Sequence, residues 1–252
     1  MKTIKISIGT HERELSAPDC WEDLNQSQFL FVVSHMPQGN SLPYDIMRHL
    51  LSLSDEERLF LLPMHLFALH RDTFQFLDDY SAIKRWLVSD ITLADGRHCL
   101  PPAADFDNVS WEEFIFADQL AQLGNWVAVS ACLFRPTVPN PTEDADPRVP
   151  FSRVGTTNRL PLFKQLDQTA ILAVQINYLA LRSHLTARYR HLFSSHPTAK
   201  GQPSSSWPKI SQSLLGEDVW NEQQLFRTSV SQVLFRLDNI IVQSLQNKSR
   251  HA

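Results

Sequence analysis

A proline-rich stretch over residues 135–161, poor in apolar residues, interrupts a chain with regular apolar patterns on both sides. It also separates an acidic front from a basic back: residues 1–150 carry 11 Lys and Arg against 22 Asp and Glu, and residues 151–252 carry 12 against 5. These features predict an N-terminal unit over 1–134, a connector over 135–161, and a C-terminal unit over 162–252 that packs back on the first. Opposite charges indicate two surfaces with different partners, or a homo-oligomer in which unlike halves meet.

The apolar patterning predicts a mainly α fold, a helical bundle with one or two small β-hairpins. Apolar residues recur at helical spacing, and the helices expected from them lie after Pro18 and over residues 73–88, 110–134, 162–193 and 217–246. Capping boxes at 54–57 and 110–113 each mark the start of a helix, and Pro63 is expected to end or kink the first.

Two short segments have the residue patterns of β-hairpins. Ile4, Ile6 and Ile8 share one face before Gly9, which predicts an N-terminal hairpin with the residues that follow. A second hairpin is predicted over residues 91–100, where an Asp-Gly pair at 95–96 separates two apolar segments.

The final helix carries the widest apolar stripe of the chain. It is made of Val219, Phe226, Val230, Val233, Leu234, Leu237, Ile240, Ile241 and Leu245. A stripe of this width has to be buried against the rest of the protein or against a partner. We expect it to be core, with a groove for a partner as the alternative.

Several classes of protein are disfavoured by what the sequence lacks. It has no glycine-rich phosphate-binding motif and no nucleophile-elbow motif, and it contains seven glycines in all. No apolar run approaches the roughly 20 residues that cross a bilayer, and the N-terminus alternates like a strand rather than a secretory signal. We therefore expect a cytoplasmic protein without a membrane segment, whose three cysteines are reduced.

Acidic and histidine side chains give no convincing catalytic or metal site. His65 and His70, with Asp72, have neither the i, i+4 spacing of a helical zinc pair nor a nuclease pattern. Glu112 and Glu113 are explained by a helix N-terminus, and Asp118 is only loosely on the same face as Glu113. The pair at 78–79 has no partner at ligand spacing. We predict no catalytic residue, metal or cofactor, although an enzyme whose site is assembled from His65, His70, Asp72 and Glu113 remains an alternative.

A basic cluster near the end of the 162–193 helix is the candidate partner-binding site. It comprises Arg182, His184, Arg188, Tyr189, Arg190 and His191. Such a cluster suits an acidic protein surface or phosphates, and it also fits a solvated helix end. Because the whole chain is acidic, with a pI near 6.2, a protein partner is the first expectation and a nucleic-acid-binding accessory protein is an alternative.

Three short motifs resemble those of small proteins encoded in prophages and other mobile elements. They are Trp21-Glu22-Asp23-Leu24 followed by Gln28-Phe29, Phe114-Ile115-Phe116-Ala117-Asp118, and Ala131-Cys132-Leu133-Phe134-Arg135-Pro136. The resemblance covers about half of the chain and leaves its back half outside. It implies a non-enzymatic protein-binding protein of a phage tail or tail-like particle, such as a tail assembly chaperone or adaptor, and it assigns no functional residue.

Overall fold

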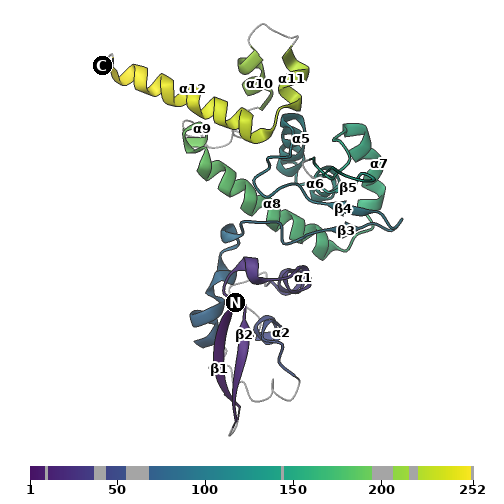
Figure 1. The fold of residues 1–252 in the computed structure, drawn as a ribbon, viewed down its shortest axis with the longest axis vertical. Helices are drawn as coiled ribbons and strands as arrows, with labels where there is room; N and C mark the ends of the chain where they lie inside the picture. Colours follow the sequence, from purple (N-terminus) through teal and green to yellow (C-terminus); the bar gives the residue numbers. More distant parts are fainter. Residues whose placement is uncertain are drawn as a thin grey trace. The chain divides into compact units, whose positions relative to one another are not determined.

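The computed structural model describes residues 1–8, 11–36, 44–54, 68–142, 145–194, 207–215 and 221–250. The chain folds into two compact units. The first unit comprises Met1–Ser89 with Asp167–Leu181, and the second comprises Asp90–Leu166 with Arg182–Ala252. Both are drawn in Figure 1, and the predicted fold class is confirmed: the protein is mainly helical and carries two small antiparallel sheets.

The first unit opens with the predicted hairpin. Strand β1 (Lys2–Ile8) pairs antiparallel with β2 (His11–Ala17), so that Ile4 lies opposite Leu15. A turn of 3-10 helix at Trp21–Asp23 and helices α1 (Gln26–His35) and α2 (Tyr44–Leu50) follow. The single helix expected after Pro18 is therefore divided, because Asn25 caps a new helix through a reciprocal pair of hydrogen bonds with Gln28.

Residues 73–88 do not form the helix that their apolar spacing predicts. The structure has short turns in their place, one of π-helix and two of 3-10 helix, at His70–Phe74, Gln75–Asp78 and Tyr80–Ala82. The capping box at 54–57 and Pro63 involve residues outside those described, so the helix they predict is not tested.

A buried amide binds the non-helical chain that follows Ala82. Helix α8 (Gln168–Arg188) carries Asn177, whose side chain is fully buried in the first unit. Its carbonyl oxygen accepts hydrogen bonds from the backbone N–H groups of Leu87 and Val88, at 3.0 and 3.2 Å, and its amide nitrogen donates to the carbonyl of Arg85. These bonds satisfy backbone groups that a helix would otherwise have paired internally.

The second unit contains the other predicted hairpin. Strands β3 (Ile91–Thr92) and β4 (His98–Leu100) pair across the expected turn, where Gly96 adopts φ +82°. A third strand, β5 (Arg135–Pro136), joins the edge of β4. The turn forms as predicted because glycine adopts this left-handed conformation without steric cost.

The helix expected over residues 110–134 is two helices. Helix α5 (Trp111–Gln122) is capped by the Ser110 hydroxyl as predicted, but the Glu113 side chain pairs with Arg135 instead of completing the capping box. Helix α6 (Trp126–Leu133) is capped by Asn125. Gly124 ends the first helix with φ +69°, a left-handed conformation that glycine commonly adopts at the end of a helix. The two helices pack against each other, and α6 also packs against α7 (Arg153–Phe163).

The predicted boundaries of the units differ from the observed ones. Residues 135–161 are part of the second unit, because they supply β5, the buried Arg148 and most of α7. The chain passes between the units at Ser89 and again around α8, which begins in the first unit and ends in the second. The helix predicted over 162–193 is in turn divided into the end of α7, then α8, and α9 (Arg190–Ser194).

The C-terminal region of the second unit holds α10 (Trp207–Leu215), α11 (Glu222–Arg227) and α12 (Val230–Arg250). The expected helix over 217–246 is interrupted between α11 and α12. There Trp111 N–H donates to the Thr228 carbonyl at 2.8 Å, and Val230 N–H donates to the Val109 carbonyl at 2.9 Å. This pairing with the start of α5 takes the backbone groups that would continue the helix.

Candidate functional site

A groove of about 780 Å³ lies on the second unit, between α10, α11 and α12. Its lining residues are Leu214, Leu215, Asn221, Gln224, Leu225, Thr228, Gln232, Val233, Phe235, Arg236, Asn239, Ile240 and Gln243. Six of these residues are apolar and seven are polar or charged, four of the latter on α12 and three on α11 or at its ends. Grooves of this kind are where proteins hold ligands or segments of partner chains.

Helix α12 leaves the core part-way along its length. Its first half is buried, with Val230 and Leu234 at 0% exposure and Leu237 at 7%. One turn further on, Ile240 is 51% exposed, and Leu245 is 52% exposed. In Figure 1 the helix continues past α9 to the marked C-terminus. The apolar stripe thus divides: Val230, Val233, Leu234 and Leu237 are core, as expected, whereas Ile240 and Leu245 are exposed.

Two tryptophans anchor α10, which forms one wall of the groove. Trp207 is 3% exposed, and its indole N–H donates to Asp118 Oδ2 of α5 at 2.7 Å. Trp111 of α5 donates in turn to Ser211 Oγ of α10 at 2.9 Å. The two rings pack edge to face, with centroids 5.3 Å apart. Buried hydrogen bonds and aromatic packing therefore hold this wall to the body of the second unit.

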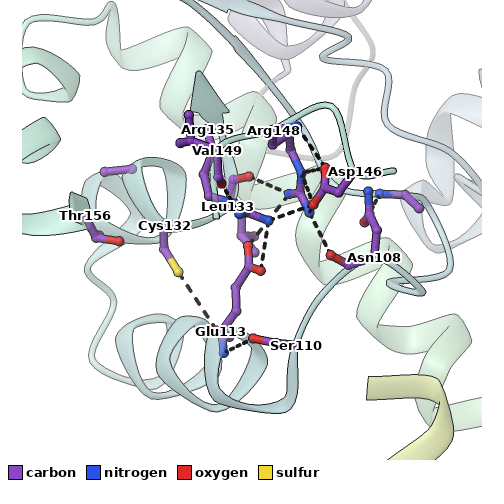
Figure 2. Close-up of polar contacts among 12 residues, drawn as sticks. Asn108, Ser110, Glu113, Cys132, Leu133, Arg135, Asp146, Arg148, Val149 and Thr156 are labelled. Carbon is purple, nitrogen blue, oxygen red and sulfur yellow. Dashed lines mark hydrogen bonds and ion pairs between the residues drawn. The ribbon is translucent and has the colours of Figure 1, made fainter. Parts of the chain in front are cut away.

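The most concentrated set of charges in the second unit lies elsewhere, inside the protein (Figure 2). Glu113 points from α5 toward Arg135 and Arg148, which lie on the proline-rich segment. Arg135 Nη2 donates to Glu113 Oε2 at 3.1 Å and to Asp146 Oδ2 at 3.0 Å. Arg148 donates to both oxygens of Asp146, and to the main-chain carbonyls of Leu133 and Asn108.

Three members of this ionic cluster are buried, and Asp146 is 25% exposed. The side chains of Glu113, Arg135 and Arg148 are 1%, 3% and 0% exposed. Burial raises the pKa of Glu113 to about 7, although the charges of the two arginines act in the opposite direction. Burial would also raise the pKa of Asp146, but its bonds to Arg148 outweigh that effect and hold the pKa below its usual range. The cluster fastens the 135–149 segment to α5, with the carboxyl group of Glu113 buried among the arginines.

Two cysteines lie near this cluster without forming a disulfide. Cys99 and Cys132 are fully buried free thiols, and Cys20 of the first unit is half-buried and also free. Burial raises the pKa of Cys99 to about 11 and that of Cys132 well above its ordinary value. Buried protonated thiols are poor nucleophiles. All three thiols are free, as the odd number and wide spacing of the cysteines predict.

The predicted basic cluster is partly used inside the second unit. Arg182 donates to Asp118, Tyr189 donates to the Ser231 carbonyl at 3.2 Å, and His191 lies 3.2 Å from Asp238. The other three members are the half-buried His184 and the exposed Arg188 and Arg190. Three of the six members are therefore bound to groups on α5 and α12, and two of the arginines face solvent.

The dispersed candidates for an enzyme site are engaged in local contacts. In the first unit His70 Nε2 lies 3.2 Å from Asp78, and Asp72 accepts from Arg71 at 2.8 Å. Glu113 belongs to the second unit and is bound by arginines. Asp79 caps the Tyr80–Ala82 turn, and the exposed Glu112 accepts from Arg153. His65 lies outside the described residues.

Neither a metal site nor a membrane span is found within the described ranges. No group of three or more His, Cys, Asp or Glu side chains there is placed to hold a metal ion. No helix in that part of the chain combines the length and the apolar character needed to cross a bilayer.

The sequence predicts a groove along the last helix only as an alternative to core, and it does not identify the residues that line it. The polar side of the groove comes from Gln232, Arg236, Asn239 and Gln243, which recur at i, i+4, i+7 and i+11 on the predicted last helix. That spacing places the four residues on one face of the helix and is the sequence signal for this side of the groove. A polar helix face is ordinarily solvated, so the spacing alone does not predict a binding site.

Comparison with known proteins adds no identification. The sequence matches no protein-family model, and no curated protein or solved structure is significantly similar to it.

Proposed function

We propose that the protein is a non-enzymatic binding protein that holds a partner protein in the groove between α10, α11 and α12. The observation that carries this proposal is the emergence of the α12 stripe from the core: Leu237 is 7% exposed, whereas Ile240 is 51% exposed. Phe235, at 62%, lines the same groove. Large apolar side chains gathered on one face favour association, since covering each of them contributes about 1–2 kcal/mol.

The resemblance of the front half to prophage-encoded proteins directs the choice of partner. On that resemblance we propose a phage or mobile-element origin and a partner from a tail or tail-like particle. The role is that of an assembly chaperone or adaptor. Such a protein needs apolar surface that is covered only while the partner is bound, and the outer half of α12 meets this need.

The ionic cluster and the basic cluster give weaker support to the two alternative functions, an enzyme and a nucleic-acid-binding protein. The carboxylate of Glu113 is buried among arginines, so it supports neither acid–base catalysis nor metal binding at the surface. In the basic cluster, Arg182 and His191 already face Asp118 and Asp238. Two exposed arginines provide a smaller phosphate-binding surface than the six-residue cluster suggests.

The test is a capture experiment followed by a titration with purified proteins. The tagged full-length chain is used to recover partners from host cells that carry the mobile element, and the recovered protein is identified, purified and titrated. Ile240→Glu is the test variant. Asn247→Glu is its matched control, because Asn247 is an exposed residue of the same helix that does not line the groove. Circular dichroism checks that both variants keep their helix content.

We expect the purified partner to bind the wild type and Asn247→Glu equally and Ile240→Glu at least tenfold more weakly. Equal binding by all three proteins would overturn the groove as the binding site. Recovery of nucleic acid that is lost when Arg188 and Arg190 are both changed to Glu would instead assign the function to the basic cluster.

A further inference from the structure

The groove has a polar side whose composition indicates which kind of segment it holds. Gln232, Arg236, Asn239 and Gln243 all line the groove, and each is exposed. Their spacing of four, three and four residues places them in one row along α12. At 1.5 Å per residue this row is about 16 Å long.

Three of these four side chains are carboxamides. A carboxamide has an oxygen that accepts hydrogen bonds and an NH₂ group that donates them, so it can pair with both the N–H and the C=O of a peptide group. Gln224, on the opposite side in α11, adds another exposed carboxamide. A row of such groups can bind a main chain whatever its side chains are.

Only an extended segment presents its main chain in this way. In a helix the N–H and C=O groups bond to each other, so a docked helix would leave the carboxamides without main-chain partners. An extended chain rises about 3.3 Å per residue and places alternate side chains on one face. About five residues would match the 16 Å row, with alternate side chains toward the apolar wall of Leu214, Leu215 and Leu225.

Charge restricts the segment further. Arg236 is the single ionised side chain among the described residues that line the groove, and no carboxylate accompanies it there. A guanidinium pairs best with a carboxylate, through two parallel hydrogen bonds. An acidic residue within the segment could pair with Arg236 in this way.

From these contacts we propose that the groove binds an extended segment of about five residues, with alternating apolar side chains and one carboxylate. In this assignment, which rests on the proposed function, the carboxamide row of α12 holds the main chain and Arg236 pairs with the carboxylate.

The test uses defined peptides and the full-length chain. The main probe is fluorescein-labelled Ser-Val-Thr-Val-Asp-Leu-Ser, whose Val, Val and Leu alternate. The second probe has the same sequence with N-methyl groups on both valines and the leucine, which removes three N–H donors. The third is a stapled helical peptide with the same apolar residues and one Asp. Binding is followed by fluorescence anisotropy.

The double variant Asn239→Leu/Gln243→Leu removes two carboxamides while it keeps the shape of the helix. Asn247→Leu is the matched control. We expect the main probe to bind the wild type and the control alike, and to bind the double variant at least tenfold more weakly. The N-methylated probe should lose at least tenfold in affinity for the wild type, and replacement of Asp by Lys in the main probe should also weaken binding.

Equal binding of the main and N-methylated probes would overturn the inference, as would stronger binding of the helical probe or no binding of the main probe. The protein captured from host cells separates this failure from failure of the proposed function. If that partner loses affinity for Ile240→Glu but keeps it for Asn239→Leu/Gln243→Leu, the groove is the binding site. The inference that its carboxamides hold an extended main chain is then wrong.

Discussion

The carboxylate of Glu113 lies 3.1 Å from the guanidinium of Arg135 at a position where neither side chain is more than 3% exposed. Two charges in such a place are stable only as partners, because each has lost its hydration. Glu113 comes from α5 and Arg135 from β5, so their contact joins the start of the proline-rich segment to a helix that precedes it by more than a dozen residues.

Removal of Glu113 should therefore destabilise the second unit. We expect Glu113→Ala to lower the free energy of unfolding by about 3 kcal/mol at pH 6, because it leaves a buried N–H donor of Arg135 without its acceptor and opens a cavity. Urea denaturation measures the change. Glu112→Ala is the control: its carboxylate pairs with Arg153 at the surface and its loss should change stability by less than about 0.5 kcal/mol. Equal effects of the two variants would contradict this account.

The pKa of Glu113 predicts how stability changes with pH. The folded protein keeps this proton up to about pH 7, whereas the unfolded chain loses it near the ordinary value of 4.5. Between these values the folded state binds more protons, so the contribution of Glu113 to stability is complete below pH 4.5 and is lost as the pH rises through 7. The loss is on the order of 3 kcal/mol.

Glu113→Gln provides the comparison for that pH profile. Because glutamine does not ionise, the free energy of unfolding of this variant should vary less between pH 5 and pH 7.5 than that of the wild type. The measurement is urea denaturation at half-unit steps of pH. Parallel profiles would show that Glu113 does not titrate in this range.

Asp146, whose pKa is lowered, affects stability in a separate pH range. Its stabilising effect is lost only as the pH falls below its ordinary pKa of 3.8.

Asn177 should be as important to the first unit as Glu113 is to the second. Asn177→Ala leaves the N–H groups of Leu87 and Val88 and the carbonyl of Arg85 without their partner, and we expect a loss of about 3 kcal/mol. Hydrogen exchange at the amides of Leu87 and Val88 should accelerate. Gln175→Ala, on the same helix but half-buried, should have little effect. Unchanged exchange at both amides would count against the role of Asn177.

The two halves of α12 should respond differently to truncation. Leu234→Ala removes a fully buried side chain and should cost about 2–4 kcal/mol, because a cavity remains in the core. Leu245→Ala removes a side chain that is 52% exposed and should cost less than about 0.5 kcal/mol. Thermal denaturation of both variants in the absence of a partner gives the comparison. A large loss for Leu245→Ala would mean that the outer half of α12 is covered within the protein itself.

The sequence by itself determined those elements whose cause is local. The two hairpins follow from period-two alternation and, in the second, from a glycine at the turn position that needs positive φ. The start of α5 follows from the hydroxyl of Ser110, and the apolar stripe on the last helix follows from its spacing. These signals involve residues close together in the chain, so they can be read without knowledge of the fold.

Only the tertiary structure decided where helices stop and which polar residues are buried. The pairing of Val109 and Trp111 with residues around Thr228 separates α11 from α12. Asn177 binds the non-helical backbone of residues 85–88 from about ninety positions away in the sequence. Arg135 and Arg148 stand in a segment that has the composition of an exposed linker, yet they are buried because Glu113 and Asp146 lie opposite them. The groove depends on the same long-range contacts, since its walls come from three helices whose packing no local pattern specifies.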